Sequence, residues 1–170
     1  MPSPRSALAA APIRFAAVDR LGVVHDLGSR EHESTVAVAC AITHAPIATL
    51  SLQRPDGSFS VRIGDELHVV AAADSFTRHV VADPDGPTVV RSLLEDPRFA
   101  ENRFVAGPPG LRAYIGVPVR SAHGDVLGAL EVADMRVRNW SHQQVATTVT
   151  LGCLIEKYLE LRQVLARLDG

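Results

Sequence analysis

The sequence predicts a domain of the α+β class, with helices at both ends of the chain and short strands between them. Apolar residues recur every three or four positions near both ends, which is typical of helices that bury one face. Apolar and polar residues alternate in the middle, and turn signals containing Pro and Gly separate the alternating segments. A chain of 170 residues is long enough to bury one hydrophobic core and suits a single domain.

Two helices are predicted near the start of the chain. Residues 15–27 carry an apolar residue at every third position from Val18 onward. Residues 31–44 contain the apolar run from Val36 to Ile42 and predict a mostly buried helix, which ends before Pro46. Residues 1–12, rich in Ala, Pro and Ser, predict a flexible tail, so the domain is expected over residues 13–170.

The middle of the chain predicts hairpins, a short helix and an irregular loop. Residues 54–57 (Arg-Pro-Asp-Gly) and residues 121–125 have the composition of tight turns. A helix is predicted at residues 73–82, and the Pro and Gly residues within 92–110 predict a long loop. Strands are predicted at residues 47–52, 59–63, 87–91, 111–119 and 126–132.

The last helix is predicted to run from Ser141 to Leu168. Ser141 and Gln144 have the spacing of a capping box, in which each side chain bonds the other residue's backbone N–H. Such a helix is about 40 Å long at 1.5 Å per residue. Leucines recur through its last part at coiled-coil spacing over two heptads. We therefore expect residues 154–170 to extend as a linker or dimerisation helix, forming a parallel helical-bundle homodimer together with residues 15–27.

Composition and motifs argue against several classes of function. The formal net charge is −2, unlike the basic balance of nucleic-acid-binding proteins. No apolar run reaches the length of a membrane helix, and no secretory signal is apparent, so we expect a cytoplasmic protein that binds neither nucleic acid nor membrane. No catalytic triad spacing, phosphate loop or metal-binding pair of histidines is present, which predicts neither an enzyme nor a metal site.

The chain has two cysteines, Cys40 and Cys153, in apolar stretches that read as helices. They lack the spacing of a metal or redox motif. The sequence predicts two buried thiols, and a disulfide or redox switch is the alternative.

A specific pattern occupies residues 96–134, which read DPRFAENRFVAGPPGLRAYIGVPVRSAHGDVLGALEVAD. This segment resembles the second half of a GAF domain, with its Asp-x-Arg-Phe loop, Arg-x-Tyr-x-Gly-x-Pro strand and Gly-x-Leu-x-Val-x-Asp strand. Residues 75–79 are similar to the family's Ser-Phe-x-x-His helix. The resemblance covers roughly residues 15–158.

The resemblance implies a central antiparallel sheet with the first and last helices on one face. The 73–82 helix and the 92–110 loop would roof the other face, where GAF ligands bind. It implies a sensory module that binds a small molecule and signals through its terminal helices. The alternative is a ligand-free module for dimerisation or protein interaction.

Two departures from the family pattern narrow these expectations. Thr77 and Glu131 stand where related GAF domains often carry cysteine, so cysteine-dependent reduction of methionine sulfoxide is not expected. No cysteine stands where bilins are attached in phytochrome-like GAF domains. Haem binding is an alternative, although the sequence singles out no histidine as its ligand. The sequence does not identify any ligand or cofactor.

Glu131 is the most informative site candidate. Strand alternation places it with Leu127, Ala129 and Ala133 on one face, and Leu130 and Val132 on the other. A carboxylate among alanines must be paired, hydrogen-bonded or protonated. We expect Glu131 and Tyr114 to contact a ligand, with Arg112 on the face of Tyr114 as a further candidate contact. The alternatives are a structural pair between Glu131 and Arg112, and a Glu131 that reaches solvent at an edge.

The other candidates lie on the predicted roof, and each has a structural alternative. His79 and Thr77 belong to the roof helix, where His79 could simply pack beside its neighbours. Ser75 could cap that helix. Asp96 and Phe99 could contact a ligand. The alternative is that Asp96 holds the loop through Arg98 and that Phe99 is the hydrophobic anchor of the loop.

Overall fold

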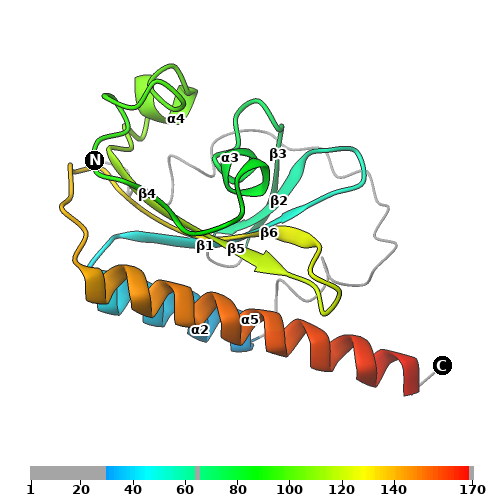
Figure 1. Ribbon diagram of the computed structural model, residues 1–170. Coiled ribbons are helices and arrows are strands. Elements are labelled where there is room, and N and C mark those ends of the chain that lie inside the picture. The colour runs from blue at the N-terminus through cyan, green and yellow to red at the C-terminus, as the bar shows by residue number, and fades with distance from the viewer. Residues whose placement is uncertain (1–29, 64–65, 169–170) are drawn as a thin grey trace.

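The computed structural model describes residues 30–63 and 66–168, which form one antiparallel sheet between two layers (Figure 1). The predicted 15–27 helix and 1–12 tail lie outside the described residues. The six strands have the order β3-β2-β1-β6-β5-β4. The strands are β1 (Ile47–Gln53), β2 (Phe59–Ile63), β3 (Glu66–Val70), β4 (Thr88–Val90), β5 (Ala113–Arg120) and β6 (Val126–Asp134).

Two long helices cover one face of the sheet, and short helices and loops cover the other (Figure 1). Helices α2 (Arg30–Thr43) and α5 (His142–Leu168) lie side by side. Their ends are joined where the Gln144 side chain donates to the Thr43 carbonyl at 2.9 Å. Helices α3 (Thr77–Ala82) and α4 (Arg103–Ala106) lie across the sheet from them. The expected arrangement of layers is therefore confirmed for the described residues.

The hydrophobic core is divided into two clusters, one on each face of the sheet. The cluster under α2 and α5 is aliphatic, and its centre holds Leu50, Ile115, Leu130, Val132 and Ile155. Helix α5 comes close to β5 at Gly152, where an added Cβ would lie 2.8 Å from a methyl carbon of Val117. The cluster on the other face is built around Phe76, Val80, Phe99 and Tyr114.

The predicted capping box is present at the start of α5. The Ser141 N–H donates to the Gln144 side chain at 2.9 Å, and the Gln144 N–H donates to the Ser141 hydroxyl at 3.1 Å. These two bonds satisfy donors that a helix start leaves free. The last turns of α5 extend past the edge of the sheet (Figure 1), and Leu161 and Leu168 are exposed there.

Several local details differ from the sequence-based expectations. The sequence analysis did not predict β3, whose five residues alternate only weakly between buried and exposed because it is an edge strand. Helix α3 begins at Thr77 rather than at residue 73. Its N-cap is Phe76, without a side-chain cap, so Ser75 does not cap the helix as one alternative proposed. Neither cysteine is fully buried, since Cys40 is partly exposed and Cys153 is exposed.

Leu127 was assigned to the wrong face of β6. It packs against the helix-side cluster, although strand alternation from Glu131 places it on the other face. A register irregularity between β5 and β6 at Val119 and Arg120 explains the difference. Val119 pairs with Gly128 and Arg120 with Val126, so Leu127 is an extra residue that interrupts the alternation.

Candidate functional site

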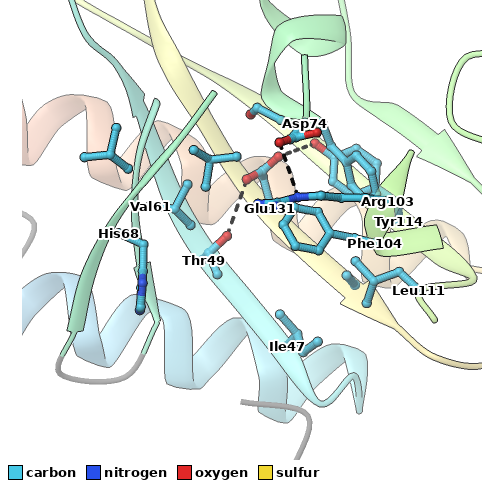
Figure 2. A pocket seen from close by; sticks show the side chains of 15 residues that line it. Ile47, Thr49, Val61, His68, Asp74, Arg103, Phe104, Leu111, Tyr114 and Glu131 are labelled. Carbon is cyan, nitrogen blue, oxygen red and sulfur yellow. Dashed lines mark hydrogen bonds and ion pairs between the residues drawn. The ribbon is translucent and has the colours of Figure 1, made fainter. Parts of the chain in front are cut away.

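A cavity of about 90 Å³ lies between the sheet and the segments that cover it (Figure 2). Apolar side chains predominate on its walls, and Glu131 and Thr49 supply polar atoms from the sheet. Strands β1, β2, β3, β5 and β6 all contribute residues. The lining consists of Ile47, Thr49, Val61, His68, Val69, Val70, Asp74, Ser75, Phe76, Arg103, Phe104, Leu111, Tyr114, Glu131 and Ala133.

Glu131 is held at the cavity wall by three hydroxyl groups. It pairs in register with Thr49 of β1 on one side and Gly116 of β5 on the other. Its Oε1 accepts from the Tyr114 hydroxyl at 2.7 Å and from the Thr77 hydroxyl at 3.0 Å. Within the described part of the chain, its Oε2 accepts only from Thr49, at 3.4 Å. The two oxygens therefore differ, because Oε1 has two good donors and Oε2 has one long one.

Gly116 explains how Tyr114 reaches Glu131. An added Cβ at Gly116 would lie 2.3 Å from the Tyr114 hydroxyl oxygen and 2.5 Å from a methyl carbon of Val80. The missing side chain thus leaves space for the Tyr114 ring to lie along its own strand and for Val80 of α3 to approach. This glycine makes room for both the hydrogen bond and the contact between roof and sheet.

The environment of Glu131 changes its acidity. Burial raises the pKa of the Glu131 carboxyl from 4.5 to about 7, although the bonds from Tyr114, Thr77 and Thr49 work in the opposite direction. Burial, and then the nearby Glu131 charge, raise the pKa of Tyr114 well above its ordinary value. Tyr114 is therefore a neutral donor near pH 7, while Glu131 is close to half ionised there.

Aromatic rings form the roof beside this network. The Phe76 ring meets those of Phe99 and Tyr114 edge to face, with centroids 5.2 and 5.3 Å apart. Phe99 is fully buried and anchors the loop before α4. His79 packs against Phe99 with ring centroids 4.7 Å apart, and burial lowers the pKa of its imidazole. His79 thus supports the roof from behind and is not among the residues that line the cavity.

Asp96 and Arg98 bind each other rather than facing the cavity. The Arg98 guanidinium lies 2.7 Å from the nearer Asp96 oxygen, and the backbone N–H of Arg98 donates to Asp96 Oδ1 at 3.0 Å. The hydrogen bonds from Arg98 lower the pKa of Asp96. This geometry favours the structural alternative for Asp96, in which it stabilises the 92–110 loop by binding Arg98 of the same loop.

The alternative pairing of Arg112 with Glu131 was wrong. The Arg112 guanidinium donates instead to the carbonyls of Val105 and Leu111, both at 2.9 Å. The Arg112 backbone N–H bonds the Asp134 carbonyl just before β5 begins at residue 113, so the side chain leaves the sheet to follow the loop. Of the predicted residues, Glu131, Tyr114 and Thr77 are brought together, and Ser75 lines the cavity nearby.

Sequence reasoning missed an ion pair among the cavity-lining residues, between Asp74 and Arg103 at 3.2 Å (Figure 2). Both side chains are partly exposed, which places the pair at the rim. The Asn102 side chain donates to the Asp74 carbonyl at 2.9 Å and also caps α4. The pair joins the segment before α3 to α4, and no regular sequence spacing links two residues so far apart.

Comparison with known proteins identifies the class of domain. The family model described as the GAF domain matches residues 32–159, and the chain belongs to this family. A cyclic di-GMP phosphodiesterase of Pseudomonas aeruginosa is 33% identical over 126 residues. That alignment covers 74% of this chain but 21% of the relative, so the chain corresponds to about a fifth of that protein.

Solved GAF-like structures share the fold at low sequence identity. The blue-light-absorbing PixJ GAF domain of Thermosynechococcus elongatus has a TM-score of 0.65 at 16% identity, covering 89% of this chain and 98% of that one. A domain assigned to a two-component sensor histidine kinase of Sinorhizobium meliloti has 0.57 at 13%, covering 88% and 99%. A type II free methionine-R-sulfoxide reductase of Thermoplasma acidophilum has 0.58 at 13%, covering 79% and 95%.

Within residues 30–63 and 66–168, no helix is both long enough and apolar enough to cross a membrane.

Proposed function

We propose that this chain is a GAF-type sensory module that binds a small molecule in the cavity between sheet and roof and signals through its helices. The observation that carries the proposal is the Glu131 carboxyl, which lies at the wall of an apolar cavity with one oxygen weakly bonded. A partly buried carboxyl that is desolvated at an apolar wall is costly to keep ionised. A ligand that hydrogen-bonds to it offsets part of that cost.

A physical connection between the roof side and the output helix supports the signalling part of the proposal. The Arg120 guanidinium donates to the Pro84 carbonyl at 2.6 Å, in the turn that follows α3. The Arg120 backbone N–H donates to the Glu156 side chain of α5 at 2.7 Å. A ligand that binds one position of α3 more tightly than another would therefore shift the contacts of α5.

Native mass spectrometry of the protein purified from cells tests the ligand directly. We expect a bound species of small mass that leaves on gentle activation, and a lower occupancy in Glu131→Gln. A wild-type protein without bound mass, whose melting temperature also stays fixed across a metabolite library, would contradict the proposal.

The second candidate function is a ligand-free dimerisation module. It is favoured by leucines of α5 that are exposed in the single chain. The exposed fractions are 58% for Leu154, 56% for Leu161 and 76% for Leu168. Exposed apolar rows of this kind often mark interfaces between proteins. Pairing through α5 is also compatible with the first proposal, since paired helices transmit a change between two copies.

Light scattering of wild type and of the double variant Leu154→Glu with Leu161→Glu tests this pairing. We expect a dimer that dissociates in the variant, because the charges would be buried without partners. Gln143→Glu, on an exposed position of the first turn of α5, is the control for added charge. A wild-type monomer at micromolar concentration would count against the dimer.

We infer that the cavity does not use thiol chemistry, in contrast to what related cysteine-bearing GAF domains require. Cys40 is in α2 and Cys153 in α5, both on the helix side of the sheet and away from the cavity. Replacing both by serine should leave any ligand binding unchanged. Loss of binding in that variant would overturn this inference.

A further inference from the structure

We propose that the cavity selects a small cation, namely a primary ammonium or amidinium group on a short apolar body, with the Glu131 carboxylate as its partner. This inference rests on the proposed function, because it names the chemical class of the ligand at the same site. It follows from which donors and acceptors in the cavity are already engaged, and from the walls around them (Figure 2).

The free acceptor is Oε2 of Glu131. An ionised carboxylate can accept about four hydrogen bonds. Among the described residues, Oε1 receives its bonds from Tyr114 and Thr77, whereas Oε2 receives only the 3.4 Å bond from Thr49. The unused capacity is therefore concentrated on the oxygen that faces β1, and a ligand that donates N–H groups would fill it.

The arginines near the cavity are already engaged. Arg103 lies 3.2 Å from Asp74, so its charge is compensated at the rim. Arg112 points to two backbone carbonyls of the loop. His68 lies on the far side of the cavity, with Nε2 3.4 Å from a carboxyl oxygen of Glu66 but without a hydrogen bond among the described residues. An entering anion would therefore find both arginines already facing a carboxylate or a carbonyl, which leaves His68 as the one basic side chain lining the cavity that makes no such bond among the described residues.

The walls of the cavity limit the size of the apolar part of the ligand. Ile47, Val61, Phe104 and Leu111 surround the space in front of Glu131 (Figure 2). An apolar cavity of about 150 Å³ holds one benzene molecule. The present cavity of about 90 Å³ therefore suits a body of a few carbon atoms. A longer ligand would extend to the rim and part Arg103 from Asp74.

Cation binding should be linked to the ionisation of Glu131. The pKa of this carboxyl is about 7, so the ionised fraction rises about tenfold between pH 6 and pH 8. The other titratable groups around the cavity are Tyr114, His68, Asp74 and Arg103. Tyr114 stays protonated across this range because its pKa is raised well above 10.

The test is a chemical-shift titration of the full chain with three probes that each contain four carbon atoms: n-butylammonium, n-butanol and butyrate. At pH 8 we expect n-butylammonium to bind at least about tenfold more tightly than either other probe. Its affinity should fall about tenfold on going to pH 6, in proportion to the ionised fraction of Glu131, while the affinity for n-butanol should change less than about twofold.

Glu131→Gln keeps the shape of the side chain and removes its charge. We expect it to lower the affinity for n-butylammonium at least about tenfold, to abolish the pH dependence and to retain n-butanol binding. Glu95→Gln, which changes an exposed carboxyl outside the cavity, is the matched control and should behave as wild type. The preference of the wild type and its pH dependence test the inference even if the Glu131→Gln variant is poorly folded.

The outcomes separate this inference from the function on which it rests. Binding of n-butanol with no preference for n-butylammonium, or tighter binding of butyrate, would overturn the cation inference and leave a ligand-binding cavity. Failure of all three probes to bind the wild type would overturn both. A preference for n-butylammonium that persists in Glu131→Gln would overturn the assignment of Glu131 as the partner of the cation.

Discussion

The two faces of the sheet are built from the same strands but differ in the side chains that they present. On the helix face, β6 presents Leu130 and Val132 to an aliphatic core that is fully buried. On the opposite face, the same strand presents Ala129, Glu131 and Ala133. Small residues there leave room for a cavity and a carboxyl. The helix face therefore contributes mainly to stability, whereas the cavity face is packed less completely and holds a polar site.

The largest expected effect is on the helix face. Leu130→Ala should lower the free energy of unfolding by about 2–5 kcal/mol, because it empties space in a tightly packed core. Urea denaturation measures the loss. Leu94→Ala is the control at an exposed position away from the paired helices, with an expected change below about 0.5 kcal/mol. Equal losses in the two variants would contradict the assignment of the core to this face.

The next effect is on the cavity face and depends on pH. Because the pKa of Glu131 is raised to about 7 in the folded protein, the folded state holds its proton more tightly than the unfolded state does. Its contribution to stability is therefore present at low pH and is lost as pH rises through about 7. The stability difference between wild type and Glu131→Gln should change by about 2–3 kcal/mol between pH 5 and pH 8.

Chemical denaturation at several pH values measures this difference, and its sign is fixed. Wild type should lose stability relative to Glu131→Gln as pH rises. A difference that stays constant with pH would mean that Glu131 has an ordinary pKa, and the contrast between the two faces would then be only one of packing.

A smaller effect is expected for Tyr114→Phe. This change removes the hydroxyl that donates to Glu131 and keeps the ring, so the aromatic contacts with Phe76 and Phe99 remain. We expect a loss of about 1–2 kcal/mol near pH 8, where Glu131 is charged. The pKa of Glu131 should also rise, because the bond from Tyr114 lowers it. A carbon-detected NMR titration of the Glu131 carboxyl measures the shift, and a pKa that falls would contradict the geometry.

The smallest effect is expected at the surface of the roof. Asp96→Asn removes the charge that pairs with a half-exposed Arg98. Solvent screens such a pair, so the loss of stability should stay below about 1 kcal/mol at pH 7. Thermal unfolding of wild type and variant measures it. A loss as large as that of Leu130→Ala would show that this loop belongs to the core and not to the roof.

Much of the fold and part of the candidate site could be predicted from the sequence. Strand alternation assigned Leu130, Val132 and Glu131 to the correct faces, because side chains in a strand alternate strictly. Alternation failed at Leu127, where an extra residue interrupts the pairing. It also failed to indicate β3, whose His68 and Val70 form a wall of the cavity.

The partners of the charged side chains were harder to predict. Tyr114 and Arg112 share a strand face by alternation, and only the loop geometry decides that Tyr114 reaches Glu131 while Arg112 turns to carbonyls. The rim pair of Asp74 and Arg103 joins two loop-side segments with no periodicity between them. Such contacts depend on how segments cross in space, which spacing along a chain does not describe.

The close contact between α5 and β5 at Gly152 has a mechanical consequence. Gly152 lies against Val117, and sixteen residues of helix follow it to Leu168. At 1.5 Å per residue that segment is about 24 Å long. A rotation of about 5° about the Gly152 contact would therefore displace the far end by about 2 Å, by the same geometry. A movement too small to disturb the core would be large enough to change how leucines at the end of the helix meet another surface.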